Sequence, residues 1–284
     1  DLGGSLRTPA SFCSVVGLRP SPGRCARTSE TPFNTLSVAG PMARNVGDLG
    51  LMLDAMAGAH AGDPLALERP ATPFQTAAET PVPPARIGFS PDLGFLPVMP
   101  EIARISEAAA ARFSELGTEV AAACPDLADA PEIFQTLRAA GFASGVGRLL
   151  ADHADRLKPE VVWNIEKGLA LAATDVGRAE ARRGALVQRM AAFLDTHDLL
   201  VCPAAPVPPF DVDIRYVTEI EGQKLDTYID WIAITFCLTL TGCPVLVLPC
   251  GFTEAGLPVG IQLVGRPRGE AALLSAAAAA EALF

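Results

Sequence analysis

The stretch from Trp231 to Thr253 contains no charged residue, and it restricts the possible folds more than any other part of the sequence. It is long enough to cross a membrane as a helix. Its second half, however, contains two glycines and two prolines, which predict a helix of about three turns ending at Leu240 and then a strand from Val245 to Leu248. Consecutive aliphatic residues are typical of a strand covered on both faces. We therefore expect a buried strand and no membrane-spanning segment.

Strand and helix patterns alternate through the rest of the chain. Arg86 to Phe89 and Glu119 to Ala123 have the composition of strands, and Pro100 to Leu116 between them has apolar residues at helical spacing, with Gly117 as the terminating residue. A strand, helix and strand in this order imply parallel pairing of the two strands.

The last third continues the alternation. Strands are expected at Asp198 to Cys202 and at Val259 to Val264, with a hairpin turn at Gly256 before the second of them. An alanine-rich helix from Glu270 to Leu283 would cover the sheet. Together these patterns predict an α/β fold with a mixed, largely buried central sheet that helices cover on both faces.

The 284 residues, half of them hydrophobic, suffice for one large domain, and we expect residues 1–284 to form a single α/β domain. Residues 59–84 are rich in proline and predict a surface loop that resembles a linker. Residues 131–194 are almost entirely helical in pattern. Before them, Asn45 is expected to cap a helix that turns Met52 and its apolar neighbours toward the core.

The composition narrows the classes of function. A net charge of −10 and a pI near 4.8 argue against a nucleic-acid partner, because no basic stripe is present to neutralise phosphates. The seven cysteines are odd in number and lie mostly in apolar runs, which is typical of free thiols in a reducing cytoplasm. No Cys-x-x-Cys pair occurs, so no metal site is expected. We expect a cytoplasmic protein that acts on a small molecule.

A pair of glycines, Gly3 and Gly4, directly precedes Ser5. Glycine allows backbone conformations that bring amide groups close to a ligand, and successive N–H groups aimed into one hollow can stabilise an oxyanion. The backbone from Leu2 to Ser5 could therefore hold the oxyanion of an acyl intermediate while the Ser5 hydroxyl attacks. Cys13 is expected to pack beneath this loop.

The block that contains these residues, DLGGSLRTPASFCSVVGLRP, is similar to the core motif of the amidase signature family. Leu6, Ser14 and Arg19 depart from the family pattern, where Ile, Gly and Lys are usual. The resemblance continues, in the family's order, through three further blocks: Leu36 to Gly58, Asp198 to Phe210, and Thr241 to Pro267. Several blocks in one order are far more specific than a single short motif.

The resemblance implies the amidase signature fold and roles for particular residues. Ser5 matches the serine that is acylated, the backbone of Leu2, Gly3, Gly4 and Ser5 matches the oxyanion hole, and Asp1 and Arg7 match residues that brace the loop. It implies no metal or organic cofactor. Residues 131–194 and the segment around Trp231 and Phe236 are where it places substrate specificity, so these two aromatic residues are candidates for the substrate pocket.

The family's base is a lysine that acts through a second serine on a cis peptide bond, a variant of the nucleophile-and-base arrangement. Both residues lie upstream of the block that begins this chain, so the resemblance implies a C-terminal portion, with the N-terminal part of the fold missing. The three lysines and three histidines that are present lie in contexts typical of surface residues. A Ser5–His–Asp arrangement stays open, because such triads are recognised by geometry.

The function expected from the resemblance is hydrolysis of a carboxylic amide to an acid and ammonia or an amine, through an acyl-enzyme on Ser5. One alternative is the amidase (A) subunit of a glutamine-dependent aspartyl- or glutamyl-tRNA amidotransferase. A second is a catalytically silent fragment that lacks the upstream lysine and cis-serine. The expected substrate is a small-molecule amide, with no nucleic-acid or membrane partner, and a homodimer is one expected assembly.

Overall fold

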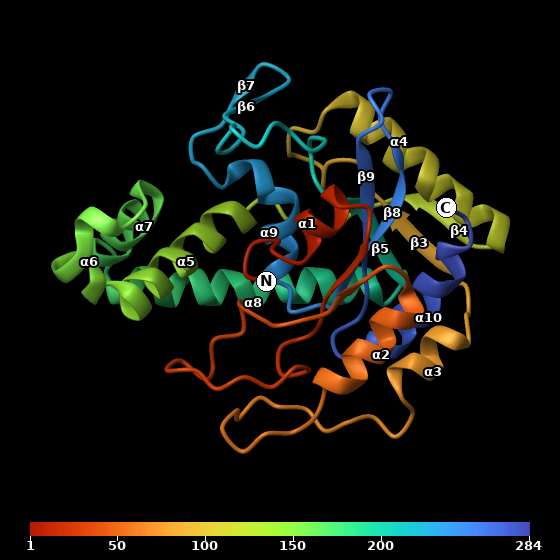
Figure 1. The fold of residues 1–284 in the computed structure, drawn as a ribbon, viewed down its shortest axis with the longest axis horizontal. Coiled ribbons are helices and arrows are strands. Elements are labelled where there is room, and N and C mark those ends of the chain that lie inside the picture. Colours follow the sequence, from red (N-terminus) through yellow and green to blue (C-terminus); the bar gives the residue numbers. More distant parts are fainter.

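The computed structural model describes residues 1–284 and contains a seven-stranded sheet in the order β2-β1-β8-β9-β5-β3-β4 (Figure 1). The strands of this sheet are β1 (Val16–Arg19), β2 (Met42–Ala43), β3 (Arg86–Phe89), β4 (Glu119–Ala122), β5 (Leu199–Pro203), β8 (Val245–Phe252) and β9 (Pro258–Val264). A separate ribbon is formed by β6 (Glu219–Ile220) and β7 (Gln223–Lys224).

The helices are α1 (Arg7–Phe12), α2 (Val46–Met56), α3 (Phe74–Glu79), α4 (Pro100–Ala111), α5 (Ala130–Val146), α6 (Arg148–His153), α7 (Pro159–Leu169), α8 (Ala173–Leu194), α9 (Ala233–Thr239) and α10 (Glu270–Glu281). Short 3₁₀ helices are η1 (Arg112–Leu116), η2 (Ala154–Arg156) and η3 (Asp230–Ile232). In Figure 1, α2, α3 and α10 lie together on one side of the sheet, and α5 and α8 extend across the other part of the molecule.

The sheet is mixed, as the sequence predicts. β3 pairs with β4 and with β5 in parallel, whereas β5 with β9, β9 with β8, and β8 with β1 are antiparallel. The parallel pair β3 and β4 confirms the strand–helix–strand prediction, and the β8–β9 hairpin confirms the turn, where Gly256 has a φ of +76°.

The first half of β8, Val245 to Leu248, is buried on both faces, which confirms the interpretation of the uncharged stretch. Leu246 and Leu248 point into one hydrophobic core with α2, α3 and α10, while Val245 points into a second core with α5, α8 and α9. The helix expected before it is present as η3 followed by α9. No helix in the structure combines the length and apolarity needed to span a membrane.

Local chemistry explains several boundaries. The Asn45 side chain accepts a hydrogen bond from the Asp48 amide at 2.7 Å and so caps α2. Gly117 ends η1 with a φ of +81°, a conformation that glycine adopts at little cost. Both features confirm the predicted helix ends.

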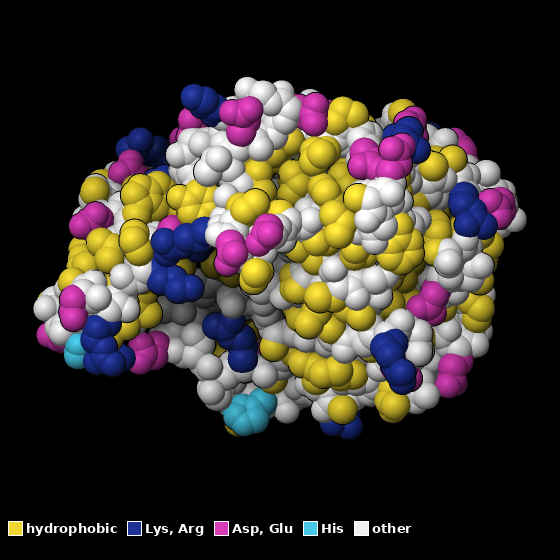
Figure 2. All heavy atoms as spheres, turned by 45° about the horizontal axis from the view of Figure 1, so that its top comes forward, with side chains coloured by type: hydrophobic (Ala, Val, Ile, Leu, Met, Phe, Trp, Pro, Cys, Tyr) yellow, Lys and Arg dark blue, Asp and Glu magenta, His cyan; other side chains and the backbone are white.

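Three local predictions are wrong. The proline-rich stretch 59–84 is not loop throughout, because it contains α3, whose Phe74 is buried under α2. Leu49 and Leu53 of α2 are buried as predicted, but Met52, expected on the same inward face, is 44% exposed. Cys13 is exposed rather than packed beneath the loop, because it lies just past the end of α1, outside the contact between that helix and β8. In Figure 2 hydrophobic side chains gather from the middle to the right of the face shown, and charged side chains lie along its rim and in a group left of the centre.

Candidate functional site

The loop that carries Ser5 is organised around the carboxylate of Asp1. Its Oδ1 atom accepts a hydrogen bond from the Gly4 amide at 3.0 Å, and its Oδ2 atom accepts one from the Leu6 amide at 3.0 Å. Arg7 binds the same carboxylate at two points, with Nη2 at 2.9 Å from Oδ1 and Nε at 3.1 Å from Oδ2. These four bonds fold the chain around Ser5 into a tight turn before α1.

Arg7 connects this turn to the core of the molecule. Its side chain is fully buried, and it donates to the Thr235 carbonyl, to Gln262 Oε1 at 3.2 Å and to Thr239 Oγ1 at 2.8 Å. Burial lowers the pKa of Arg7 to about 9, which still leaves the guanidinium charged at pH 7. The ion pair is therefore retained at neutral pH.

Gln262 is a member of this network that the sequence prediction missed. It lies on β9 with no exposed surface, and its Nε2 donates to the Pro203 carbonyl at 2.9 Å and the Ile234 carbonyl at 3.1 Å while Oε1 accepts from Arg7. The sequence does contain a signal for this role, because Gln262 is the one polar side chain in the apolar run from Ile261 to Val264. A buried side-chain amide needs several polar partners, so a glutamine in such a run indicates a buried hydrogen-bond network.

Arg19 supports the same turn from β1. Its Nη1 donates to the Asp1 carbonyl and lies 3.6 Å from the Asp1 carboxylate, while Nε and Nη2 have no partner in the structure. Burial, followed by the nearby charges of Arg7 and Arg183, lowers the pKa of Arg19. The buried Asp1 carboxylate is thus held between two guanidinium groups.

Gly4 is fixed in place by its surroundings. Its φ is +137°, and a Cβ atom at this position would lie 2.6 Å from Thr235 Oγ1 and 2.9 Å from Thr8 Oγ1. The Thr235 hydroxyl also donates to the Gly3 carbonyl. Only glycine fits this position without a shift of the backbone or of Thr235.

Ser5 itself is exposed, and its hydroxyl makes no hydrogen bond within the chain. Among the four amides of the predicted oxyanion hole, that of Gly4 is already bonded to Asp1, so it is not free to bind an oxyanion in this arrangement. The amides of Leu2, Gly3 and Ser5 have no acceptor within the chain. Of the four predicted donors of the oxyanion hole, only the amides of Leu2, Gly3 and Ser5 are therefore free to bind an oxyanion.

No lysine or histidine forms a hydrogen bond with Ser5. Lys158 and Lys224 are exposed, as predicted, but Lys167 is not a simple surface residue: its Nζ donates to Gln135 Oε1 at 2.6 Å and lies 4.8 Å from the Trp163 ring centroid. Two of the histidines, His60 and His153, are exposed, and the third, His197, is buried and stacked on Phe193 with ring centroids 4.3 Å apart. The Ser5 hydroxyl thus has neither of these bases within hydrogen-bonding reach in this arrangement.

The two candidate pocket residues have different surroundings. Trp231 is half-buried and packs with Phe210 and Phe12, at ring-centroid distances of 5.3 and 6.3 Å. Phe236, in contrast, has no exposed surface and stacks on Phe134 at 4.3 Å within the second core, so its assignment to a pocket is wrong. On α9, Phe236 points to α5, away from the surface.

The short helix η3, which contains Trp231, adjoins the Ser5 loop. The next residue, Ile232, would lie 3.3 Å from a Cβ atom on Gly3, and Asp230 accepts hydrogen bonds from Thr227 and from Gln135 Nε2 at 3.0 Å. The Ile232 contact joins η3 to the turn, and the Asp230 bonds tie η3 to the preceding loop and to α5.

Comparison with known proteins gives a consistent result. The model of the family described as Amidase matches residues 1–274. The chain is 34% identical to an acylamidase of Rhodococcus erythropolis, over all of this chain and 60% of that protein. It is 32% identical to the A subunit of the glutamyl-tRNA(Gln) amidotransferase of Moorella thermoacetica, over 99% of this chain and 61% of that protein. The chain thus spans about three fifths of the length of these relatives.

Solved structures agree on the fold. A bacterial aryl acylamidase superposes with a TM-score of 0.90 at 24% identity, covering 99% of this chain and 61% of that one. A 6-aminohexanoate cyclic dimer hydrolase superposes with a TM-score of 0.85 at 23% identity, covering 100% of this chain and 63% of that one.

Proposed function

The chain belongs to the amidase signature family, and on this basis we propose that it supplies the nucleophile of an enzyme that hydrolyses a carboxylic amide through an acyl-enzyme on Ser5. The observation that carries the proposal is the position of Ser5: an exposed hydroxyl on a turn that buried ion pairs hold rigid. A nucleophile must be accessible to substrate and fixed in orientation, and this arrangement supplies both.

In the proposed reaction, Ser5 Oγ attacks the amide carbonyl carbon, and its proton passes to the leaving nitrogen as the C–N bond breaks. Water then attacks the ester, releasing the acid and returning a proton to Ser5. The amides of Leu2, Gly3 and Ser5 are the proposed donors to the oxyanion in both steps. The resemblance assigns the proton transfers to a lysine and a second serine ahead of Asp1.

Covalent labelling tests the nucleophile. In a protein that also contains the lysine and second serine, a serine-directed phosphonate should label Ser5 and should fail to label the Ser5→Ala variant. Ser14→Gly is the matched control, because Ser14 lies in the same block at a φ of +53°, where glycine is unstrained; it should label at the parental rate. Equal labelling of Ser5→Ala and the parent would refute the assignment.

We propose that Trp231, with Phe12 and Phe210, forms one wall of the substrate pocket. The support is that these rings are only half-buried and that η3 packs on the Gly3 backbone. Residues 131–194 and the loop before η3 would add specificity through the Gln135–Asp230 contact.

A second candidate function is that of the amidase component of a tRNA amidotransferase, which would release ammonia from glutamine for a partner protein. The relatives named as A subunits of glutamyl-tRNA(Gln) amidotransferases, at about one-third identity, favour it. Glutaminase activity that appears only on mixing with the partner protein would support this function, whereas hydrolysis of simple amides by the protein alone would support the amidase.

Three further properties are proposed on independent grounds. All seven cysteines are free thiols, which favours a cytoplasmic location. The acidic net charge favours a small-molecule substrate over nucleic acid. A homodimer is the simplest assembly, and sedimentation velocity would test it.

A further inference from the structure

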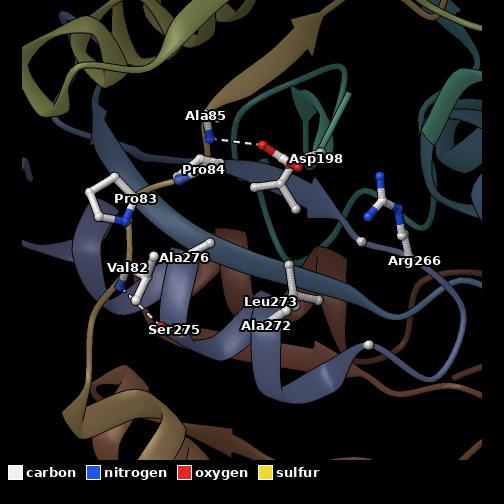
Figure 3. Close-up of a pocket in the computed structure, with 13 residues that line it drawn as sticks. Val82, Pro83, Pro84, Ala85, Asp198, Arg266, Ala272, Leu273, Ser275 and Ala276 are labelled. Atoms are coloured by element: carbon white, nitrogen blue, oxygen red, sulfur yellow. Dashed lines mark hydrogen bonds between the residues drawn. The ribbon is translucent and has the colours of Figure 1, made fainter. Parts of the chain in front are cut away.

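A cavity of about 550 Å³ lies between α10 and the segment that leads into β3 (Figure 3). Its wall is mostly apolar and includes Val82, Pro83, Leu199, Leu273 and Ala276. No residue of the Ser5 loop, α1 or η3 lines it. The volume is within the range of about 300–1,000 Å³ that is usual for small-molecule sites, yet the proposed acyl transfer makes no use of it.

Two opposite charges border this cavity without pairing. In the β5–β9 register Leu200 is opposite Val264, so two residues further on, where both strands have ended, Asp198 and Arg266 come opposite one another. Opposed side chains of opposite charge on neighbouring strands usually attract one another. Here they form no ion pair within 4.0 Å, although both line the cavity.

Each of the two side chains is instead held by the backbone. Asp198 Oδ2 accepts from the amides of Ala85 at 2.7 Å and Arg86 at 3.0 Å, and Figure 3 shows the carboxylate turned toward Ala85. Arg266 donates through Nε and Nη2 to the Leu194 carbonyl. Asp198 is half-buried and Arg266 is exposed, and Asp198 Oδ1 and Arg266 Nη1 have no hydrogen-bond partner in the protein. Each of these two cavity-lining residues therefore keeps one charged atom available to a ligand.

The N-terminus of α10 adds positive electrostatic potential to the part of the cavity near Arg266. Gly269, its N-cap residue, and Ala272 line the cavity, and the first amides of a helix have no acceptor within the helix. Glu270 lies in the same turn, but its carboxylate is turned to Arg24, 3.1 Å away, and to the Ser21 amide. Its charge is therefore neutralised by Arg24, and the helix end still favours an anion.

We propose that this cavity binds a small zwitterion with an apolar body, of which a hydrophobic α-amino acid is the simplest example. Its ammonium group binds Asp198, its carboxylate binds Arg266 beside the first turn of α10, and its side chain packs on Leu199, Leu273 and Ala276. In this proposal the charges of Asp198 and Arg266 recognise the two charged groups of the ligand, and the apolar wall favours a ligand with a large apolar side chain.

Three probes of similar shape test the proposal by calorimetric titration of the 284-residue protein. L-Phenylalanine carries both charges, 3-phenylpropanoate only the carboxylate, and 2-phenylethylamine only the ammonium. L-Phenylalanine should bind at least about tenfold tighter than either analogue, because each analogue loses one charge-assisted hydrogen bond. Equal affinity for the three, or no binding of L-phenylalanine up to its solubility limit, would overturn the proposal.

Variants locate the binding. Ala272→Phe should fill the cavity and abolish binding, whereas Ala271→Phe, at the adjacent exposed position outside the cavity, should bind as the parent does. Asp198→Asn keeps an oxygen for the Ala85 and Arg86 amides but removes the charge, so it should weaken L-phenylalanine at least about tenfold and leave 3-phenylpropanoate unchanged. Thermal unfolding of each variant checks that it is folded.

A last control separates this cavity from the proposed substrate pocket. Trp231→Leu should bind L-phenylalanine with parental affinity, since Trp231 does not line the cavity. Loss of binding in Trp231→Leu together with retention in Ala272→Phe would place the amino acid near Ser5 and overturn the proposal. Neither result depends on whether Ser5 is the nucleophile.

Discussion

Asp1 and Arg7 form a two-point ion pair across the turn that carries Ser5, with N–O distances of 2.9 and 3.1 Å and no exposed side-chain surface on either partner. Six residues apart in sequence, they close the turn from behind and leave the Ser5 hydroxyl on the exposed side. The geometry of the proposed nucleophile therefore depends on a pair that cannot contact the substrate.

Replacing Arg7 by methionine should lower the free energy of unfolding by about 3–5 kcal/mol, because the Asp1 carboxylate loses its two-point partner in a buried position. Urea denaturation measures the change. The matched control is Arg178→Met, which breaks the exposed ion pair with Asp175 and should change stability by less than about 0.5 kcal/mol. A loss below about 1 kcal/mol for Arg7→Met would contradict the structural role assigned to the pair.

Gly4→Ala should destabilise the protein by about 1–3 kcal/mol and reduce labelling of Ser5 by the phosphonate at least about tenfold, because the added methyl group meets Thr235 and the φ of +137° is strained for alanine. Chemical denaturation and labelling rates measure the two effects. Gly184→Ala, in the exposed middle of α8 with no atom near the new Cβ, should instead stabilise by about 0.5–1 kcal/mol. Parental labelling of Gly4→Ala would show that the turn tolerates rearrangement.

Trp231→Leu and Phe236→Leu should separate specificity from stability. The first should lower kcat/KM for an aryl amide about threefold to tenfold more than for an aliphatic amide, since it removes an aromatic contact worth about 0.5–1.5 kcal/mol. The second should mainly destabilise the fold, by about 1–3 kcal/mol, because Phe236 has no exposed surface. A change of substrate preference in Phe236→Leu, with none in Trp231→Leu, would refute the proposed wall.

Cys13 should be the first thiol modified by iodoacetamide in the native protein, because it is exposed. The reactive species is the thiolate, and burial raises the pKa of Cys25 to about 11 and the pKa of Cys124 and Cys250 to about 12. At pH 8 these thiols are almost wholly protonated, so their modification should speed up only as the pH rises toward those values. Mass spectrometry of digested samples, with Cys13→Ser as control, measures the order; early modification of Cys25 would contradict it.

The Ser5 hydroxyl makes no hydrogen bond within residues 1–284. If the base is supplied from outside these residues, the 284-residue chain should hydrolyse amides several orders of magnitude more slowly than a protein that also contains the lysine and second serine, as is usual when one member of such a unit is removed. Parallel assays of the two proteins on one amide measure the ratio. Equal rates would show that a base within this chain serves Ser5.

Sequence patterns were sufficient where the controlling interaction is local. The cap of α2 depends on Asn45 and the amide three residues later, and the end of η1 depends on the conformational freedom of Gly117 alone. The prolines and glycines of the uncharged stretch likewise sufficed to predict a short helix followed by a buried strand. Each of these features is decided within a few residues along the chain.

The errors occur where burial depends on a distant partner. Phe236 and Trp231 are both aromatic residues of one segment, and the first is buried in the second core, where it stacks on Phe134 of α5. Lys167 has the sequence context of a solvated residue, yet Gln135 and Trp163 meet its ammonium group after α5 and α7 pack together. Gln262 and Thr235 belong to the site because each accepts a hydrogen bond from Arg7, which lies more than 200 positions away in the sequence.

The sequence by itself determined the mixed α/β sheet, the family and the position of Ser5 after two glycines, because these follow from hydrophobic pattern, turn chemistry and ordered motifs. The tertiary structure decided which amides remain free beside Ser5, which of Trp231 and Phe236 is buried, and that Asp198 and Arg266 line one cavity without pairing. The physical reason is that burial, hydrogen-bond partners and charge pairing are set by contacts between segments far apart in the chain, which no local pattern contains.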